Sequence, residues 1–157
     1  MNTDSTQDRL KLRNAVGADN IQIRQLLEKV KLPAESLDNG ATTFYVAEEN
    51  GTFVGIAGFE FYGDDALLRS VAIPPELQNR GIGERIVNSM ISIARERNLK
   101  RILLLTETAE RFFQKKDFRV IDRSSIDNEP MKQSSEFTFA CPSTAVCMVL
   151  ELKLPRS

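Results

Sequence analysis

Two glycines stand close together after an apolar run and two prolines, in the stretch from Leu68 to Arg85. The prolines end the strand that the apolar run predicts, and the residues after Gly83 repeat with helical spacing. A turn that opens a helix brings several backbone N–H groups to one point, where the helix dipole adds positive charge. Gly81 and Gly83 let the backbone approach an anion without an intervening Cβ. The sequence therefore predicts a phosphate or pyrophosphate site at this turn.

Two familiar phosphate-binding motifs do not match this turn. A P-loop needs Lys and then Ser or Thr after its second glycine, and a dinucleotide-binding turn needs a third glycine three residues later. The stretch has neither feature. A glycine-rich helix entry that holds no ligand is the alternative interpretation.

The composition narrows the chemistry. The 157 residues include no histidine, which excludes imidazole bases, Ser-His and Cys-His nucleophile pairs and His-containing metal sites. A base must then be a carboxylate or water. The formal net charge of −1 argues against nucleic-acid binding, and without a signal peptide or membrane segment we expect a cytoplasmic protein. Cys141 and Cys147 do not form a C-x-x-C pair, so we expect reduced structural thiols and no metal.

The elements that must position the turn follow from hydrophobic periodicity. Helices are predicted from Asp19 to Pro33, at 34–37, after Gly83 and at 109–116, and strands at 9–13, 43–47, 53–59, 66–73, 101–106, 118–121 and 145–152. Asn50-Gly51 predicts a hairpin between the second and third strands. This order indicates a mixed α/β (α+β) sheet with helices on its faces. We expect a single domain over residues 9–154 after a disordered tail at 1–8.

The pattern Gln-x-x-Gly-x-Gly at residues 78–83, after Pro-Pro-Glu, resembles the acyl-CoA loop of the GNAT N-acetyltransferase superfamily. The resemblance covers nearly the whole chain and implies a centrally splayed sheet with acetyl-CoA as cosubstrate. It also implies that the backbone N–H of Val71 polarises the thioester carbonyl. The cofactor contacts that it implies are Val71, Ile73, Gln78, Asn79, Arg80, Gly81, Ile82, Gly83, Glu84, Thr106 and Phe113.

A second family signature, usually Asn-x-x-Ala-x-x-x-Tyr-x-x-x-Gly-Phe, is similar to residues 106–118 with three departures. Thr106 stands at the Asn position, Phe113 replaces the Tyr that often reprotonates the CoA thiolate, and Asp117 replaces the Gly. The acid role would pass to Thr106 or Thr108, to water, or to no group, because a thiolate with a pKa of about 8–9 is a tolerable leaving group.

Within the superfamily, the chain is most similar to bacterial arsenic-resistance N-acetyltransferases and, more distantly, to the acetyltransferase domain of N-acetylglutamate synthases. The similar residues are 68–72, 105–113 and 136–145. Such relatives acetylate the α-amine of small amino acids, whose carboxylate calls for cationic side chains. Arg69 is the first candidate, because strand alternation puts it on one edge with Val71; a salt bridge to Glu60 is the alternative. Arg123, Lys132 and Ser143 lie in a long connection, residues 122–142, that could cover the acceptor.

Glu60 and Glu107 are the carboxylates best placed by sequence to act as the general base, directly or through water. Glu107 could instead cap the following helix. The predicted activity is direct transfer of an acetyl group to a small amino-acid-like amine, arsenic-containing or glutamate-like, in a ternary complex. The alternatives are a protein N-terminal or lysine acetyltransferase and a CoA-binding module without activity. An apolar last strand could also pair across a homodimer.

Overall fold

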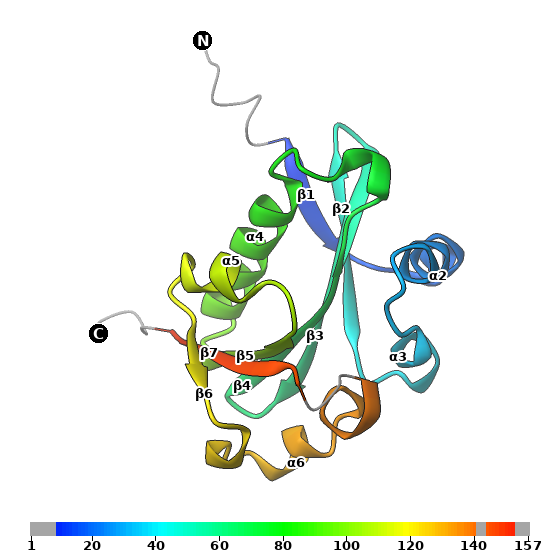
Figure 1. The fold of residues 1–157 in the computed structure, drawn as a ribbon. Helices are drawn as coiled ribbons and strands as arrows, with labels where there is room; N and C mark the ends of the chain where they lie inside the picture. The colour runs from blue at the N-terminus through cyan, green and yellow to red at the C-terminus, as the bar shows by residue number, and fades with distance from the viewer. Residues whose placement is uncertain (1–8, 141–143, 153–157) are drawn as a thin grey trace. The chain divides into compact units, whose positions relative to one another are not determined.

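The structure, a computed structural model, describes residues 9–140 and 144–152. The predicted tail at residues 1–8 lies outside these ranges, as do Cys141 and Ser143. Seven strands form one mixed sheet in the order β1-β2-β3-β4-β5-β7-β6 (Figure 1). This confirms the predicted mixed α/β architecture.

The chain divides into two compact units, and two strands contribute residues to both. The first unit contains the chain up to Phe59 together with Ser70–Ser92, and the second contains Glu60–Arg69 and the chain from Ile93 onward. The shared strands are β3 (Thr52–Tyr62) and β4 (Asp65–Ala72).

In the first unit, β1 (Leu10–Asn14), β2 (Thr43–Glu49) and β3 pair antiparallel in chain order. Asn50 and Gly51 have φ values of 55° and 81°, and two successive positive values suit the type I′ hairpin turn that the sequence predicted. The helices of this unit are α2 (Asn20–Lys29), α3 (Glu35–Asn39) and most of α4 (Ile82–Glu96), whose residues from Ile93 onward belong to the second unit. Two short 3₁₀ turns are η1 (Gly17–Asp19) and η2 (Pro75–Leu77). Apolar side chains of α2 pack in one cluster with those of β2 and β3.

In the second unit, β4 runs parallel to β5 (Arg101–Thr106), which is antiparallel to β7 (Val146–Glu151). The edge strand β6 (Arg119–Ile121) pairs antiparallel with β7, as Figure 1 shows. The short helix α5 (Glu110–Gln114) follows β5. The strands at 101–106 and 118–121 were predicted within a residue of their observed limits.

The connection between β6 and β7 contains more structure than the sequence predicted. A 3₁₀ turn η3 (Arg123–Ser125), the helix α6 (Glu129–Lys132) and a π-helix η4 (Glu136–Ala140) occupy its described part. Asn128 caps α6 by accepting a hydrogen bond from the amide of Met131, and Pro130 follows in the first turn. This cap-then-proline order was present in the sequence and could have predicted α6. Among the described residues, no helix is long and apolar enough to cross a membrane.

Candidate functional site

The turn between β4 and α4 has the backbone geometry of an anion-binding loop. Asn79 and Gly81 have left-handed φ values of 67° and 81° on either side of Arg80, and α4 begins at Ile82. Left-handed residues before a helix make consecutive N–H groups converge, and the first turn of any helix leaves its amides without intrahelical acceptors. This geometry suits the phosphate site predicted from the two glycines, which stays a prediction.

Side chains around this loop hold its shape and leave its surface open. The carboxamide of Gln78 donates to the carbonyl oxygen of Ile73 at 3.0 Å, which closes the turn across its base. Ile82 is buried, so its side chain anchors the first turn of α4 in the core. A Cβ built on Gly83 would have no atom within 4 Å. The exposed rim of the loop is formed by Gln78, Asn79, Arg80, Gly81 and Glu84.

Strand β4 is irregular just before this loop. Ser70 has a φ of 59°, and a left-handed residue interrupts the alternation of side chains along a strand. The expectation that simple alternation aligns Arg69 with Val71 therefore does not hold across Ser70. The described pairs between β4 and β5 run only from Asp65–Arg101 to Leu67–Leu103. Val71 and Ile73, predicted to line the cosubstrate, are both half-buried.

In the second unit, Arg69 lies in a buried ionic cluster. Its guanidinium donates to Glu60 at 2.8 Å, and both side chains are only 1% exposed. It also contacts Glu136 at 3.4 Å and the hydroxyl of Ser135 at 3.1 Å. The salt bridge to Glu60, the alternative left open by the sequence, is therefore formed. A role for Arg69 in acceptor binding stays a prediction.

Glu60 accepts hydrogen bonds from three side chains. Besides Arg69, the hydroxyl of Ser134 donates to it at 2.7 Å, and the phenol of Tyr62 donates to the same oxygen. Burial by itself would raise the pKa of Glu60, but the donors Ser134, Tyr62 and Arg69 together lower it below its ordinary value. Burial, reinforced by the bond to Glu60, raises the pKa of Tyr62 to about 12. Glu60 is thus a stabilised carboxylate, with a low affinity for the proton that a base must accept.

The residues at the end of β5 and just after it contact both the turn into α5 and a distant segment. The hydroxyl of Thr106 accepts the amide of Ala109 at 3.0 Å, which orders the turn into α5. Glu107 is exposed and accepts a hydrogen bond from the hydroxyl of Thr144 at 2.9 Å. This contact joins Glu107 to the segment before β7 and is not a cap on α5. Phe113 is 8% exposed and packs edge-on with its ring centroid 5.0 Å from that of Phe112.

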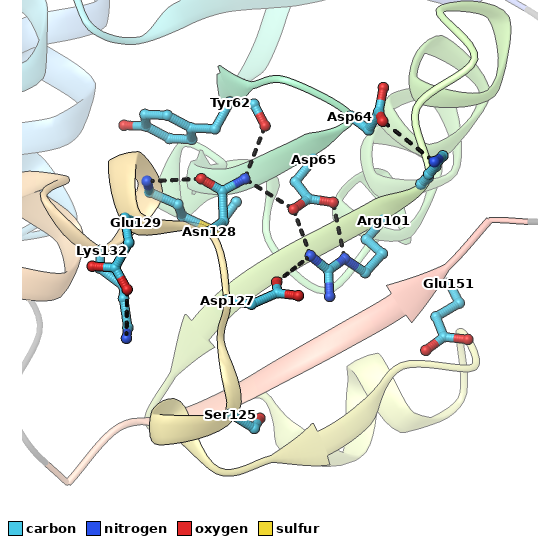
Figure 2. A network of polar contacts seen from close by, with 12 residues as sticks. Tyr62, Asp64, Asp65, Arg101, Ser125, Asp127, Asn128, Glu129, Lys132 and Glu151 are labelled. Atoms are coloured by element: carbon cyan, nitrogen blue, oxygen red, sulfur yellow. Dashed lines mark hydrogen bonds and ion pairs between the residues drawn. The ribbon is translucent and has the colours of Figure 1, made fainter.

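A second polar cluster in this unit was not predicted from the sequence. Figure 2 shows the carboxylate of Asp65 between two donors: Arg101, which binds both oxygens at 2.9 and 2.7 Å, and Asn128 at 2.9 Å. Asn128 also donates to the carbonyl of Tyr62 at 2.9 Å. These contacts fix the start of α6 to β4. The residues are far apart in the chain, so no local pattern signals the cluster.

The remaining predicted residues belong to the connection between β6 and β7. Arg123 donates to the carbonyl of Ala145 at 2.9 Å, and Lys132 lies 3.4 Å from Glu129 in an exposed ion pair. Ser143 lies outside the described residues. Within residues 9–140 and 144–152, no three acidic or cysteine side chains gather as a metal site would require.

Comparison with known proteins assigns the family. The model of the acetyltransferase (GNAT) family matches residues 13–118. The chain belongs to this GNAT family. The loop and β4 lie inside the matched segment, and the family predicted from the sequence is confirmed.

Two relatives of this GNAT chain are named amino-acid acetyltransferases. One, from Mycobacterium tuberculosis, is 30% identical over 128 residues, which are 75% of this chain and 73% of the relative. The structure is also similar to that of Rv2747 from M. tuberculosis, solved with CoA, with a TM-score of 0.75 and 26% identity over 91% of this chain and 99% of the other.

Other matches cover only part of the relative. A Bacillus subtilis protein, named for acetylation of the alanine of ribosomal protein bS18, is 30% identical over 70 residues, 45% of this chain and 46% of its own. N-acetylglutamate synthase from Neisseria gonorrhoeae has a TM-score of 0.75 at 22% identity, over 92% of this chain and 35% of its own. At that identity the likeness shows the fold alone.

Proposed function

We propose that this GNAT chain is an acetyl-CoA-dependent N-acetyltransferase that acetylates the α-amine of a small amino-acid-like molecule by direct attack. The observation that carries this proposal is the loop at residues 78–83, whose left-handed residues and open Gly83 suit a diphosphate at the start of α4. The amino-acid acetyltransferases among the relatives support the class of acceptor. More specifically, we propose that the acceptor is glutamate-like or contains arsenic.

The proposed chemistry asks little of the protein beyond positioning. The base first takes one proton from the acceptor ammonium, which frees a lone pair on the nitrogen. This nitrogen then bonds to the acetyl carbon while the carbon–sulfur bond of the cosubstrate breaks, and the second proton that the nitrogen loses balances the proton gained by the leaving thiolate. We propose the backbone N–H of Val71 as the donor to the thioester carbonyl. We favour Glu107 over Glu60 as the base for two reasons. Glu107 is exposed, whereas Glu60 is buried and its three hydrogen-bond donors stabilise its charged form, which weakens its affinity for a proton. Thr106 remains a candidate to protonate the leaving thiolate.

The test is a thiol-release assay of the purified chain with acetyl-CoA and a panel of amines. The panel contains glutamate and other α-amino acids, trivalent and pentavalent organoarsenicals, and peptides that present an N-terminal alanine or a lysine. We expect release with one of the free amino acids or organoarsenicals. Release with peptides alone would support the second candidate, a protein N-terminal acetyltransferase, which the B. subtilis relative favours. No release, with acetyl-CoA binding intact in calorimetry, would indicate a binding module.

Direct attack also predicts that neither cysteine carries the acetyl group. Cys147 is 1% exposed, and burial raises the pKa of its thiol to about 11, so it holds little nucleophilic thiolate near neutral pH. We expect Cys147→Ser and Cys141→Ser each to retain transfer to the amine identified by the panel. Complete loss in either variant, with the fold and the acetyl-CoA affinity unchanged, would indicate an acetyl-enzyme instead.

A single catalytic domain over residues 9–154, a cytoplasmic location and a homodimer remain proposals. So does acetyl transfer without a metal or a nucleic-acid or membrane partner. For the acceptor, Arg69, Arg123 and Ser143 remain the proposed contacts.

A further inference from the structure

Gly55 lies in β3 where two other segments of the first unit come unusually close. A Cβ built on Gly55 would lie 2.8 Å from the carbonyl oxygen of Ala72, 2.8 Å from Cδ1 of Ile86 and 3.0 Å from Cδ1 of Ile73. Ala72 ends β4, and Ile86 belongs to α4. Gly55 therefore lies close to both elements joined by the connection at residues 73–81, which contains most of the loop at residues 78–83.

These three contacts differ in how easily they could give way. Cδ1 of an isoleucine is the far end of a side chain and can change rotamer, whereas a carbonyl oxygen moves only with its peptide plane. Added volume at Gly55 would therefore act mainly on the backbone of Ala72. The packing on the helix side would adjust more readily.

A β-bulge lies beside Gly55, so this part of β3 departs from regular strand geometry. Ala47 pairs with Gly55 while Glu48 pairs with Phe53, which leaves Val54 as an extra residue in β3. A bulge bends its strand and is common next to functional sites. The bend and the missing side chain occur together at the position where the backbone of Ala72 comes close.

The carbonyl of Ala72 and the N–H of Ile73 belong to one peptide unit, which is planar and trans, so the two groups point in opposite directions. Because the oxygen of Ala72 lies toward Gly55, the N–H of Ile73 points away from β3. The carbonyl of Ile73 is held by Gln78 at 3.0 Å. That bond orients the next peptide unit, between Ile73 and Pro74, whereas the orientation of the Ile73 amide follows the Ala72 carbonyl and therefore depends on the space at Gly55.

We propose that Gly55 is a positioning residue for the cosubstrate: its missing side chain admits the carbonyl of Ala72 and so aims the Ile73 amide toward the bound acetyl-CoA. This inference rests on the proposed function, in which Val71 and Ile73 line the cosubstrate. A Cβ at residue 55 would turn that peptide, because it would lie 2.8 Å from the Ala72 carbonyl oxygen.

The test compares Gly55→Ala with Gly17→Ala. Gly17 lies in the same unit, has no positive φ and would have nothing within 4 Å of an added methyl group, so it controls for the loss of a glycine. We expect Gly55→Ala to weaken acetyl-CoA binding in calorimetry by about tenfold or more, and Gly17→Ala to bind like the wild type. The KM for acetyl-CoA should rise while the KM for the acceptor changes little. Equal acetyl-CoA affinities in the two variants would overturn the proposal.

A second variant separates orientation from general loss of stability. Ile86→Val removes the Cδ1 contact and leaves the carbonyl contact in place. In Gly55→Ala/Ile86→Val we expect the melting temperature to recover only in part, because the carbonyl contact remains, and acetyl-CoA binding to stay as weak as in Gly55→Ala. Wild-type affinity in the double variant would show that the helix contact decides the effect and would overturn the proposal.

The amide resonance of Ile73 gives a direct readout. It should shift when CoA is added to the wild type and to Gly17→Ala, and it should already differ in ligand-free Gly55→Ala/Ile86→Val. An Ile73 amide that keeps its wild-type shift in that variant would contradict the proposed orientation. If the wild type itself binds no acetyl-CoA, the proposed function fails, and this result is distinct from a wild type that binds and a Gly55→Ala that binds equally well.

Discussion

Replacing Gly83 by glutamate is expected to reduce acetyl-CoA binding by about 100-fold or more, because a carboxylate would stand among the amides that receive the diphosphate. Two like charges about 4 Å apart near a protein surface repel by about 4 kcal/mol. The fold should tolerate the change, because a Cβ at Gly83 has no neighbour within 4 Å. Calorimetric titration with acetyl-CoA measures the effect, and circular dichroism monitors the fold.

Gly83→Ala is the matched control for this variant. It adds the same Cβ without charge, and we expect it to keep most of the affinity for acetyl-CoA. Gly81 would be a poor control, because its φ of 81° would strain any side chain placed there. Unchanged affinity in Gly83→Glu would mean that the diphosphate binds elsewhere, and the main support for the proposed function would be lost.

The second large effect is expected at Arg69. Arg69→Met keeps much of the side-chain volume but leaves the carboxylates of Glu60 and Glu136 buried without their cation. Removing one partner of a buried ion pair costs roughly 3–5 kcal/mol, because the remaining charge stays desolvated. We expect the free energy of unfolding in urea to fall by about that amount.

Arg119→Met provides the comparison for Arg69→Met. Arg119 pairs with Glu151 at 2.8 Å, but both side chains are more than 60% exposed, at 62% and 64%. An exposed pair contributes about 0–1 kcal/mol, so this variant should unfold near the wild-type midpoint. If Arg69→Met were equally mild, the buried cluster would not be the stabilising feature that its burial suggests.

The same cluster gives a pH dependence with a definite sign. The pKa of Glu60 is lower in the folded chain than its ordinary value, so its charged form stabilises the fold above that ordinary value. This contribution is lost as the pH falls through the lower, folded value. Unfolding midpoints measured from neutral to acidic pH should fall less steeply in Glu60→Gln than in the wild type. Parallel curves would contradict this assignment.

The parts of the fold that depend on local backbone conformation could be predicted from the sequence. Asn50-Gly51 marked the hairpin, and the two glycines marked the loop before α4, because each depends on local backbone conformation. The role of Gly55 could not be predicted, because it depends on where Ala72 lies after folding. The left-handed Ser70 was missed for a related reason, since serine carries no signal for that conformation. The close approach at Gly55 and the backbone conformation of Ser70 both depend on the folded structure, and the neighbouring residues in the sequence do not signal them.

Arg69 shows where sequence reasoning about the site stopped. A cation in a strand next to a predicted thioester site suited either an acceptor carboxylate or a nearby glutamate, and no local pattern could decide between them. The structure gives the ion pair with Glu60, and the segment that supplies Ser134, Ser135 and Glu136 was read only as a long connection. The sequence therefore named two members of this cluster without indicating what surrounds them.

The anchoring of residues 134–136 on Glu60 and Arg69 limits how this protein could be re-engineered. A segment exchanged with that of a relative to change acceptor preference would have to bring a hydroxyl for Glu60 and a carboxylate for Arg69. A grafted segment without these groups would leave Glu60 and Arg69 buried without some of their partners, even if the segment bound the new substrate well. A chimera should therefore take Glu60, Arg69 and the segment at residues 134–136, or their equivalents, from the same parent protein.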